Sequence, residues 1–373
     1  MKVIMQKQSF LITCCILIAG ILCTVSFFCG NAYQKKKVQI ENETNILVKK
    51  SELNVFDSVN DKIYVIGHKS PDVDTVASSI ACADLLQKLG YDSVPVVLGN
   101  INRETDFLLK QADIEVPLLM NNAAGKNIVL VDHSEFSQAV NGVENANILA
   151  IFDHHALGNV ISTERILYDA RPIGAVSTII WLKYCDYGLI PDKKIATLLM
   201  GAILSDTRNF QLDTCTYADK LAINHLSRLA GISDTQAFHQ EMYKASISYD
   251  GMTDSEIFLS DYKEYEINGV KLAIGCLNAY DEKSAEELSL RMKEVMPDIF
   301  KARGIQIGLS QVGILHDGIS VTYLVPSDDT SKKLISSAFK YRGVYDGNAF
   351  VFRPGMSRKK DLVPALTEVL KSK

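Results

Sequence analysis

Residues Lys62–Leu89, KIYVIGHKSPDVDTVASSIACADLLQKL, pass from a short apolar run through a polar loop into a helical pattern. The run Lys62–Gly67 predicts a buried strand, and Thr75–Leu89 predicts a helix that ends before a glycine. The strand pattern recurs at three later places, Val94–Leu98, Ile128–Val131 and Ile148–Phe152. Strands that alternate with helices are typical of a mainly parallel sheet covered on both faces, so we expect an α/β fold.

The chain has 373 residues, enough for about two domains that each bury a core. We place the first domain at 61–235, a hinge at 236–248 and a smaller α/β domain at 249–373. Further helices of the first domain are expected at Ala175–Tyr184, Lys193–Leu204 and Thr216–Leu229. Strands of the smaller domain are expected at Val270–Leu277, Ile305–Gly313 and Ile319–Leu324.

Composition excludes several classes of protein. A chain that is 47% hydrophobic and 22% charged, with nine prolines, is neither disordered nor collagen-like. The formal net charge of −5 argues against a broad basic surface, so no nucleic-acid partner is expected. Four of the eight cysteines lie in one N-terminal stretch and the others lack CxxC spacing, which argues against a disulfide framework.

The stretch Phe10–Cys29 contains twenty residues and no charge. As a helix, such a stretch is long enough to span the hydrocarbon core of a bilayer. We therefore expect residues 1–32 to be a membrane anchor of one hydrophobic helix, the alternative being a signal segment cut after Ala32 before export. Lysines flank the stretch on both sides, which leaves the orientation open. The polar residues 33–60 are expected to form a tether.

Polar motifs follow three of the predicted strands. The first is GHKSPDVD at Gly67–Asp74, the second is DHSE at Asp132–Glu135 and the third is DHH at Asp153–His155. These motifs hold four of the seven histidines of the chain. Because the carboxyl ends of parallel strands share one edge of a sheet, where such folds bind their ligands, we expect the three motifs to form one site.

Carboxylates and imidazoles that converge without cysteine suit Mn²⁺, Fe²⁺, Co²⁺ or Mg²⁺ better than a thiolate zinc site. His68, Asp72 and Asp74 could supply two ions rather than one, with Asp132 and the pair Asp153–His154 completing and bridging them. Two adjacent metal ions can hold a hydroxide between them and bind a phosphate. The residues therefore predict a metal-dependent phosphohydrolase whose substrate stays open.

These motifs, in this order, resemble the DHH phosphoesterase superfamily, and the rest of the chain from Ile63 to Ala365 resembles its manganese-dependent family II inorganic pyrophosphatase branch. Four further motifs carry the resemblance: LGNINRET (Leu98–Thr105), RPIGAVST (Arg171–Thr178), LSDTRNF (Leu204–Phe210) and SRKKDLVP (Ser357–Pro364). The glycine-rich GGGH element usual in oligonucleotide-cleaving members does not occur in this sequence.

The resemblance implies hydrolysis of pyrophosphate to two phosphates by a hydroxide that bridges two Mn²⁺, with the site closed between two domains. Co²⁺ could replace Mn²⁺, and Mg²⁺ could arrive with the substrate. The implied metal ligands are His68, Asp72, Asp74, Asp132, His154 and Asp206, with Asp132 shared by both ions. His155, Lys244, Arg358 and Lys359 would bind substrate, and His133 and Asp153 would orient ligands. A homodimer through the DHH domain is a further expectation.

The sequence departs from the family pattern at Ser134, Val73 and Arg208, where an effect on the pocket or on metal preference stays open. Two alternatives also stay open. One is another DHH hydrolase, an exopolyphosphatase or a phosphodiesterase acting on oligonucleotides or cyclic nucleotides. The other is a membrane-tethered binding protein without activity, against which the complete set of implied ligands argues.

Overall fold

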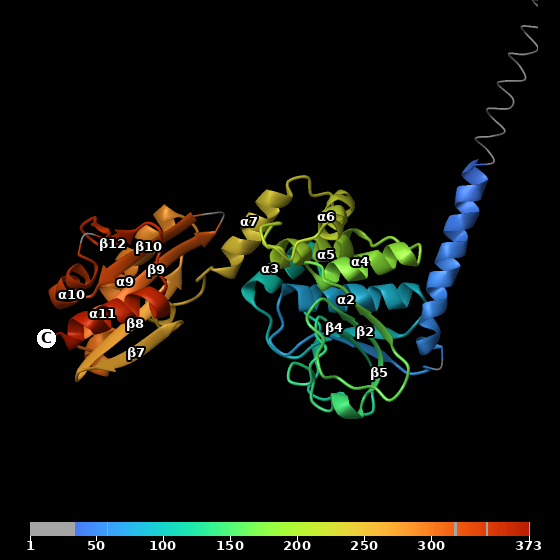
Figure 1. The fold of residues 1–373 in the computed structure, drawn as a ribbon, viewed down its shortest axis with the longest axis horizontal. Coiled ribbons are helices and arrows are strands. Elements are labelled where there is room, and N and C mark those ends of the chain that lie inside the picture. The colour runs from blue at the N-terminus through green and yellow to red at the C-terminus, as the bar shows by residue number, and fades with distance from the viewer. Residues whose placement is uncertain (1–33, 58, 317–318, 341, 373) are drawn as a thin grey trace, which may run out of the picture. The chain divides into compact units, whose positions relative to one another are not determined.

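The computed structural model describes residues 34–57, 59–316, 319–340 and 342–372. The chain divides into two units, Met1–Met242 and Tyr243–Lys373, and each unit is described by itself. The first unit is coloured blue to yellow in Figure 1 and the second orange to red. Both units combine helices with a sheet of six strands, as expected for an α/β chain of two domains.

The first unit contains a six-stranded sheet in which every neighbouring pair is parallel. The strand order is β3-β2-β1-β4-β5-β6. The strands are β1 (Ile63–Ile66), β2 (Ser93–Val97), β3 (Leu118–Leu119), β4 (Asn127–Val131), β5 (Asn147–Asp153) and β6 (Leu167–Ala170). Connections leave β1 and β4 in opposite directions, so the order reverses between these two strands, and ligands of such sheets bind beyond the carboxyl ends at that point.

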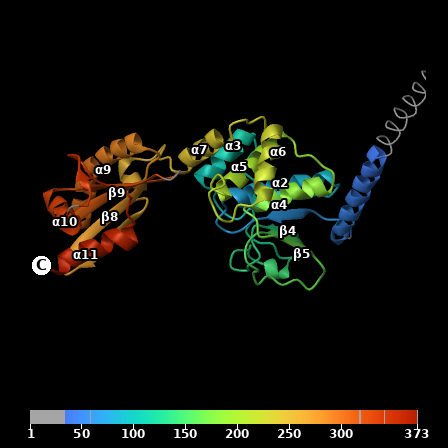
Figure 2. The ribbon, with the colours of Figure 1, turned by 45° about the horizontal axis from the view of Figure 1, so that its top comes forward.

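Side chains that alternate along each strand enter two different cores. Val65 and Val129 pack in the core shared with the helices, whereas Ile66 and Ile128 pack on the other face. The helices that contribute to the first core, labelled in Figure 2, are α2 (Val73–Lys88), α3 (Arg103–Ala112), α4 (Val176–Asp186), α5 (Lys193–Asp206) and α6 (Tyr217–Ala230). The opposite face is covered by irregular chain that includes Met120 and by the turn η2 (Val143–Asn145).

The helices and strands predicted for the first domain are confirmed to within a few residues. No boundary differs by more than two residues, and α5 is one of the helices that extend this far past the prediction, since it ends at Asp206. Its start is fixed by Asp192, whose carboxylate accepts a hydrogen bond from the Ile195 amide at 3.0 Å.

The second unit contains a sheet of order β11-β12-β10-β9-β8-β7. Only β8 and β9 run parallel, and the other pairs are antiparallel. The strands are β7 (Tyr262–Ile267), β8 (Val270–Asn278), β9 (Ile307–His316), β10 (Ile319–Pro326), β11 (Val344–Tyr345) and β12 (Phe350–Phe352). The longest three match the three strands predicted for this domain. The helices are α8 (Asp254–Leu259), α9 (Glu282–Arg303), α10 (Asp329–Phe339) and α11 (Val363–Lys371), and they contribute to cores on both faces of the sheet.

The expected hinge at 236–248 is largely helical. Gly231 ends α6 in a left-handed conformation, as its position suggests, but α7 (Thr235–Ser246) begins four residues later. The carboxylate of Asp234 accepts a hydrogen bond from the Ala237 amide at 2.9 Å and starts this helix. The boundary between the two units therefore falls inside α7, between Met242 and Tyr243.

The expected tether at 33–60 is also wrong in part. Residues 34–50 are helical, with pairs one turn apart such as Lys37 with Glu41, 3.9 Å between Nζ and Oε1. The short helix η1 (Ser51–Phe56) then places Leu53 and Phe56 in the core of the first unit. The packed domain therefore begins before residue 61. The polar composition of the segment hid this in the sequence, because its few apolar side chains, among them Val55 and Val59, are spread among charged and polar residues.

The helix η1 lies at the amino ends of β5 and β6. Asn54 lines a hollow of about 530 Å³ together with Asn147, the first residue of β5, and Leu167, the first residue of β6. The predicted anchor at 1–32 lies outside the residues that the structure describes. Among the described helices, none is both long and apolar enough to cross a membrane.

Candidate metal centre

The loop between β1 and α2 and the first turn of α2 position three of the predicted ligands. Asp72 precedes α2, and its Oδ1 accepts a hydrogen bond from the Thr75 amide at 3.0 Å, which starts the helix. The other oxygen, Oδ2, lies 3.4 Å from Nε2 of His68. Asp74 is buried in the first turn of α2 and accepts hydrogen bonds from the amides of Val176 and Ser177 at 2.6 and 2.9 Å. A predicted ligand therefore also holds the start of α4.

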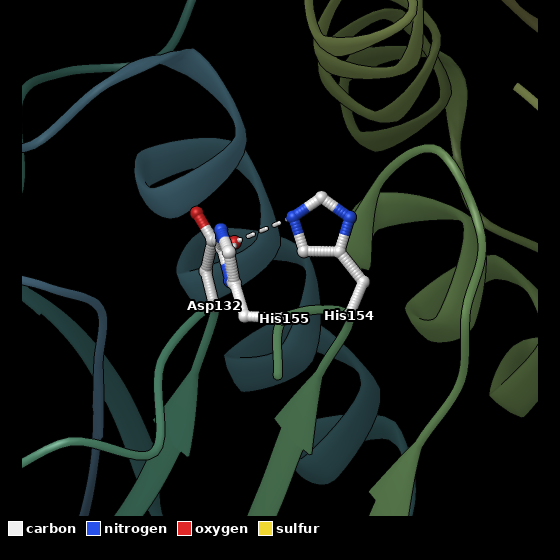
Figure 3. Close-up of side chains that lie close together, drawn as sticks. All are labelled: Asp132, His154 and His155. Atoms are coloured by element: carbon white, nitrogen blue, oxygen red, sulfur yellow. Dashed lines mark ion pairs between the residues drawn. The ribbon is translucent and has the colours of Figure 1, made fainter. Parts of the chain in front are cut away.

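Asp132 follows β4 and lies at the centre of the cluster. Its Oδ2 is 3.4 Å from Nε2 of His68, and its Oδ1 is 3.3 Å from Nε2 of His154 (Figure 3). The side chain is 2% exposed, and Oδ1 accepts no hydrogen bond from the described residues. Its φ of 64° is left-handed, a conformation that costs free energy for a residue other than glycine. Such strained residues are common at active sites and ligand-binding sites.

The motif after β5 orients two imidazoles. Nδ1 of His154 lies 3.1 Å from the carbonyl oxygen of Ile173, which can only accept, so Nδ1 donates and Nε2 faces Asp132. Nε2 of His154 is also 3.8 Å from Oδ2 of Asp206, the last residue of α5. Nδ1 of His155 lies 3.0 Å from Oδ1 of Asp153 and 3.7 Å from Oδ1 of Asp132. Figure 3 shows both rings close to the Asp132 carboxylate.

Among the residues that the structure describes, three groups of side chains are compact enough to hold a metal ion, because one ligand atom from each member lies within 4.8 Å of the others. They are His68–Asp72–Asp132, Asp74–His154–Asp206 and Asp132–His154–His155. All six predicted ligands belong to these groups, and the structure brings them together. Their role as ligands stays a prediction. His155, which was predicted to contact substrate, also lies within reach of the centre.

The cluster contains more carboxylates than imidazoles, and without a metal ion the pKa values of several of these side chains are shifted. Burial and neighbouring carboxylates raise the pKa of Asp206 to about 10 and that of Asp74 to about 7. Burial lowers the pKa of His68 and of His154, but the carboxylates beside them outweigh it and raise both to about 10. Carboxylates crowded in this way stay ionised only beside positive charge.

The donor set fits divalent cations. Buried oxygen and imidazole nitrogen atoms converge without a thiolate, which suits Mn²⁺ or Co²⁺. A buried carboxylate oxygen without a donor, as at Oδ1 of Asp132, is costly unless a cation satisfies it. The residues therefore fit a centre of two metal ions that share Asp132.

The two residues predicted to orient ligands, His133 and Asp153, make different contacts. Oδ1 of Asp153 accepts hydrogen bonds from the backbone amides of His154 and His155, at 2.8 and 3.1 Å, so it contacts a predicted ligand, and its orienting role stays a prediction. His133 contacts a backbone carbonyl instead of a ligand, with Nδ1 2.9 Å from the oxygen of Val131. Its ring is buried and borders a hollow of about 440 Å³ that also touches His68, Asp132 and His155.

Two supporting interactions were missed from the sequence. The hydroxyl of Thr75 donates to Oδ2 of Asp132 at 2.7 Å, and the amides of Val176 and Ser177 hold Asp74. Thr75 directly follows GHKSPDVD, and Val176 and Ser177 belong to RPIGAVST, so their proximity to the motifs was the available signal.

The predicted substrate-binding cations belong to the second unit. Arg358 donates from Nη1 to the backbone oxygen of Asp261 at 2.8 Å and from Nη2 to its Oδ1 at 2.7 Å. Lys359 is exposed on the same turn, Arg358–Leu362. Nζ of Lys244, on α7, lies 4.6 Å from the ring centre of Tyr280. Their contact with substrate stays a prediction.

Comparison with known proteins identifies the family. A model of the DHH family, N-terminal domain, matches residues 62–203, and a model of the DHHA2 domain matches residues 240–369. The chain is 35% identical over 316 residues to the manganese-dependent inorganic pyrophosphatase of Methanothrix thermoacetophila, covering 83% of this chain and 99% of that protein. The chain belongs to the family of manganese-dependent inorganic pyrophosphatases.

Other relatives agree with this membership. A Clostridium acetobutylicum protein named for the same activity is 34% identical over 322 residues, covering 84% of this chain and all of that protein. A solved Methanococcus jannaschii structure assigned to family II inorganic pyrophosphatases is 32% identical, with a TM-score of 0.51, and covers 83% of this chain and 99% of that one. The DHH match begins at residue 62, so η1 and residues 34–50 precede the part shared with that family model.

Proposed function

We propose that this protein hydrolyses inorganic pyrophosphate to two phosphates at the metal centre of its first unit. The observation that carries the proposal is the position of Asp132, which lies between the group His68–Asp72 and the group Asp74–His154–Asp206. This arrangement gives two cation positions with one shared carboxylate. The names of the relatives add the choice of pyrophosphate as substrate.

Two Mn²⁺ bound here would supply a water of lowered pKa and offset the charge of pyrophosphate, which has three to four negative charges, roughly. The protein residues prepare the positions. Thr75 holds Asp132, the carbonyl of Ile173 directs Nε2 of His154 toward the centre, and Asp153 orients His155. The pKa of His155 is raised, mainly by its hydrogen bond with Asp153 and further by the charge of the Asp132 carboxylate. His155 is half-exposed beside the centre, which suits a donor to a phosphate oxygen.

Arg358, Lys359 and Lys244 are proposed to bind the phosphates of the substrate. Arginine offers a planar pair of donors to phosphate oxygens, and lysine offers a point charge. Arg358 holds Asp261 in this structure, so binding of phosphate would exchange one anionic partner for another. Replacing Arg358 by alanine should raise KM for pyrophosphate more than it lowers Mn²⁺ affinity.

The proposal is tested by phosphate release from pyrophosphate, tripolyphosphate and a dinucleotide, with Mn²⁺, Co²⁺ and Mg²⁺ supplied separately. We expect pyrophosphate to be the preferred substrate, with Mn²⁺ or Co²⁺ required at the centre and Mg²⁺ added with the substrate. Faster release from tripolyphosphate or cleavage of the dinucleotide would instead favour another DHH hydrolase. No release from any substrate with any metal would favour a binding protein without activity.

We also propose that Phe10–Cys29 anchors the protein to a membrane. The support is its length of twenty residues without a charge, with lysines on both sides. The alternative is export after cleavage. Extraction of the membrane fraction with alkaline carbonate should leave the protein in the pellet, and N-terminal sequencing should find the stretch intact. Protease treatment of sealed vesicles would give the side on which the two domains lie.

A homodimer through the first unit is the last part of this proposal. The outer strands of its sheet, β3 and β6, carry exposed apolar side chains at Leu118, Leu119 and Tyr168. Unpaired outer strands of this kind can associate with a second copy. Sedimentation of residues 34–373 at several concentrations should show a dimer, and a monomer at every concentration would exclude it.

A further inference from the structure

The motif Leu98–Thr105, LGNINRET, has no part in the function proposed above, yet it packs beside the metal centre. A Cβ placed on Gly99 would lie 3.6 Å from Cδ of Pro71, so this segment rests against the loop that carries Asp72. The motif then enters α3, where Asn102 caps the helix by accepting a hydrogen bond from the Thr105 amide at 2.8 Å. Glu104 thereby lies in the first turn of α3.

Glu104 links α3 to the last turn of α5. Its Oε1 accepts a hydrogen bond from the hydroxyl of Ser205 at 3.0 Å. Ser205 directly precedes Asp206, whose Oδ2 lies 3.8 Å from Nε2 of His154. The contact therefore fixes the helix end that presents a predicted ligand.

The surroundings of Glu104 are unusual for a carboxylate. The side chain is partly buried, and its carboxylate contacts an uncharged group, the hydroxyl of Ser205. Burial raises its pKa, the Ser205 hydroxyl lowers it, and the charge of Asp72 raises it. A carboxylate in such a place destabilises the cation-free protein, and cations bound nearby would offset that cost.

We propose that Glu104 is a positioning residue of the metal centre, which holds Asp206 in place through Ser205. This inference rests on the metal centre proposed above. The ordinary alternative is that Glu104 only stabilises α3, because an acidic residue in the first turn interacts favourably with the helix dipole. The two roles differ in what they predict for the cation-free protein and for Mn²⁺ binding.

The first measurement is Mn²⁺ affinity of the metal-stripped protein by calorimetry. Glu104→Ala and Ser205→Ala should each weaken binding by about tenfold, as loss of a hydrogen bond behind a ligand does. Because the two residues act through one contact, the double variant should match the single ones to within about twofold. Glu104→Gln should keep affinity within about twofold of the parent, because its amide oxygen still accepts from Ser205. Asp106→Ala, on the same helix but exposed and paired with Lys110, should leave affinity unchanged.

The second measurement is the melting temperature without metal. The melting temperature of Glu104→Ala without metal should equal or exceed that of the parent, because a carboxylate beside Asp72 is removed. Added Mn²⁺ should raise the melting temperature of this variant by less than it raises that of the parent. A lower melting temperature without metal and unchanged Mn²⁺ affinity would overturn the proposal in favour of the structural role. Additive losses in the double variant, or a Gln variant as weak as the Ala variant, would also overturn it.

The test of Glu104 can be told apart from the test of pyrophosphate hydrolysis. If the parent protein binds two Mn²⁺ but releases no phosphate from pyrophosphate, the proposed activity fails and the role of Glu104 is still decided by the affinities. If the parent binds no Mn²⁺, both fail together.

Discussion

The hydroxyl of Thr75 donates a hydrogen bond of 2.7 Å to Oδ2 of Asp132, which joins the first turn of α2 to the end of β4. Asp132 needs such support because its backbone is left-handed and its carboxylate faces the imidazoles of His68 and His154. The contact also leaves Oδ1 without a hydrogen bond among the described residues, so that this oxygen is available to a cation.

Replacing Thr75 by valine tests this contact. Valine has nearly the same shape but cannot donate, so Asp132 loses one fixed orientation and Mn²⁺ affinity should fall by about tenfold. Calorimetry measures the affinity. Thr197→Val is the matched control, because Thr197 is buried on α5 and donates only to the carbonyl of Lys193. Equal losses in both variants would show a general effect of the substitution.

Gly67→Ala tests the packing behind the same residue. A Cβ at Gly67 would lie 2.2 Å from Cγ2 of Thr75, so Thr75 or α2 must move. The free energy of unfolding should fall by about 1–3 kcal/mol, and Mn²⁺ affinity should fall with it. Thermal and denaturant unfolding measure the first quantity. Gly99→Ala should be tolerated, because the nearest atom to its new Cβ is 3.6 Å away, and a similar loss there would contradict the steric explanation.

Asp206→Asn tests the ligand set. An amide is a weaker ligand than a carboxylate, so phosphate release from pyrophosphate should fall by more than about 100-fold. The metal-free protein should keep its fold, because Asp206 ends α5 and contacts His154 rather than the core. Circular dichroism checks the fold. Full activity in this variant would show that Asp206 is not a ligand.

Mn²⁺ binding should depend on pH. Without a cation, carboxylates raise the pKa of His68 and of His154 to about 10, so both are protonated at pH 7. A metal ion binds neutral imidazole and must displace these protons, so affinity should rise with pH, by up to about tenfold per unit for each proton released. Calorimetry in buffers of different ionisation enthalpy counts the protons. Affinity that is constant between pH 6.5 and 8.5, roughly, would contradict protonated histidines in the free protein.

A buried ion pair should matter for stability. Nζ of Lys183 is 2.7 Å from Oδ2 of Asp169 and 3.8 Å from Oε2 of Glu52, and the lysine side chain is 3% exposed. Asp169→Asn leaves this buried cation poorly paired, so the free energy of unfolding should fall by about 3 kcal/mol. Asp113→Asn, which breaks the exposed pair with Lys194, should leave the melting temperature unchanged. Equal effects would show that burial does not decide the strength of the pair.

The sequence predicted the parts of the fold that repeat a strong pattern. The buried strands β1, β4 and β5 read as continuous apolar runs, and the loops after them contain the clustered acids and histidines. Strand β6 was missed because its residues, LYDA, alternate between partly buried and exposed at the edge of the sheet. The two-residue strand β3 is too short to give a pattern.

The metal centre, like the fold, was predictable from the sequence in part. The ligand candidates were recognisable because their residue types are rare at strand ends. What holds them was not, since backbone amides such as those that contact Asp74, and the carbonyl of Ile173, leave no trace in side-chain identity. The helix at 34–50 was missed because its residues are almost all exposed and show no apolar face.

The helix η1 meets the sheet at the amino end of β5, whereas His154 directly follows the carboxyl end of that strand. A strand of seven residues spans about 23 Å, so the two features lie at opposite ends of the domain. The chain therefore enters this domain, through η1, at the end remote from the metal ligands. Changes to η1 would therefore act at a distance from the side chains that are proposed to bind the metal ions.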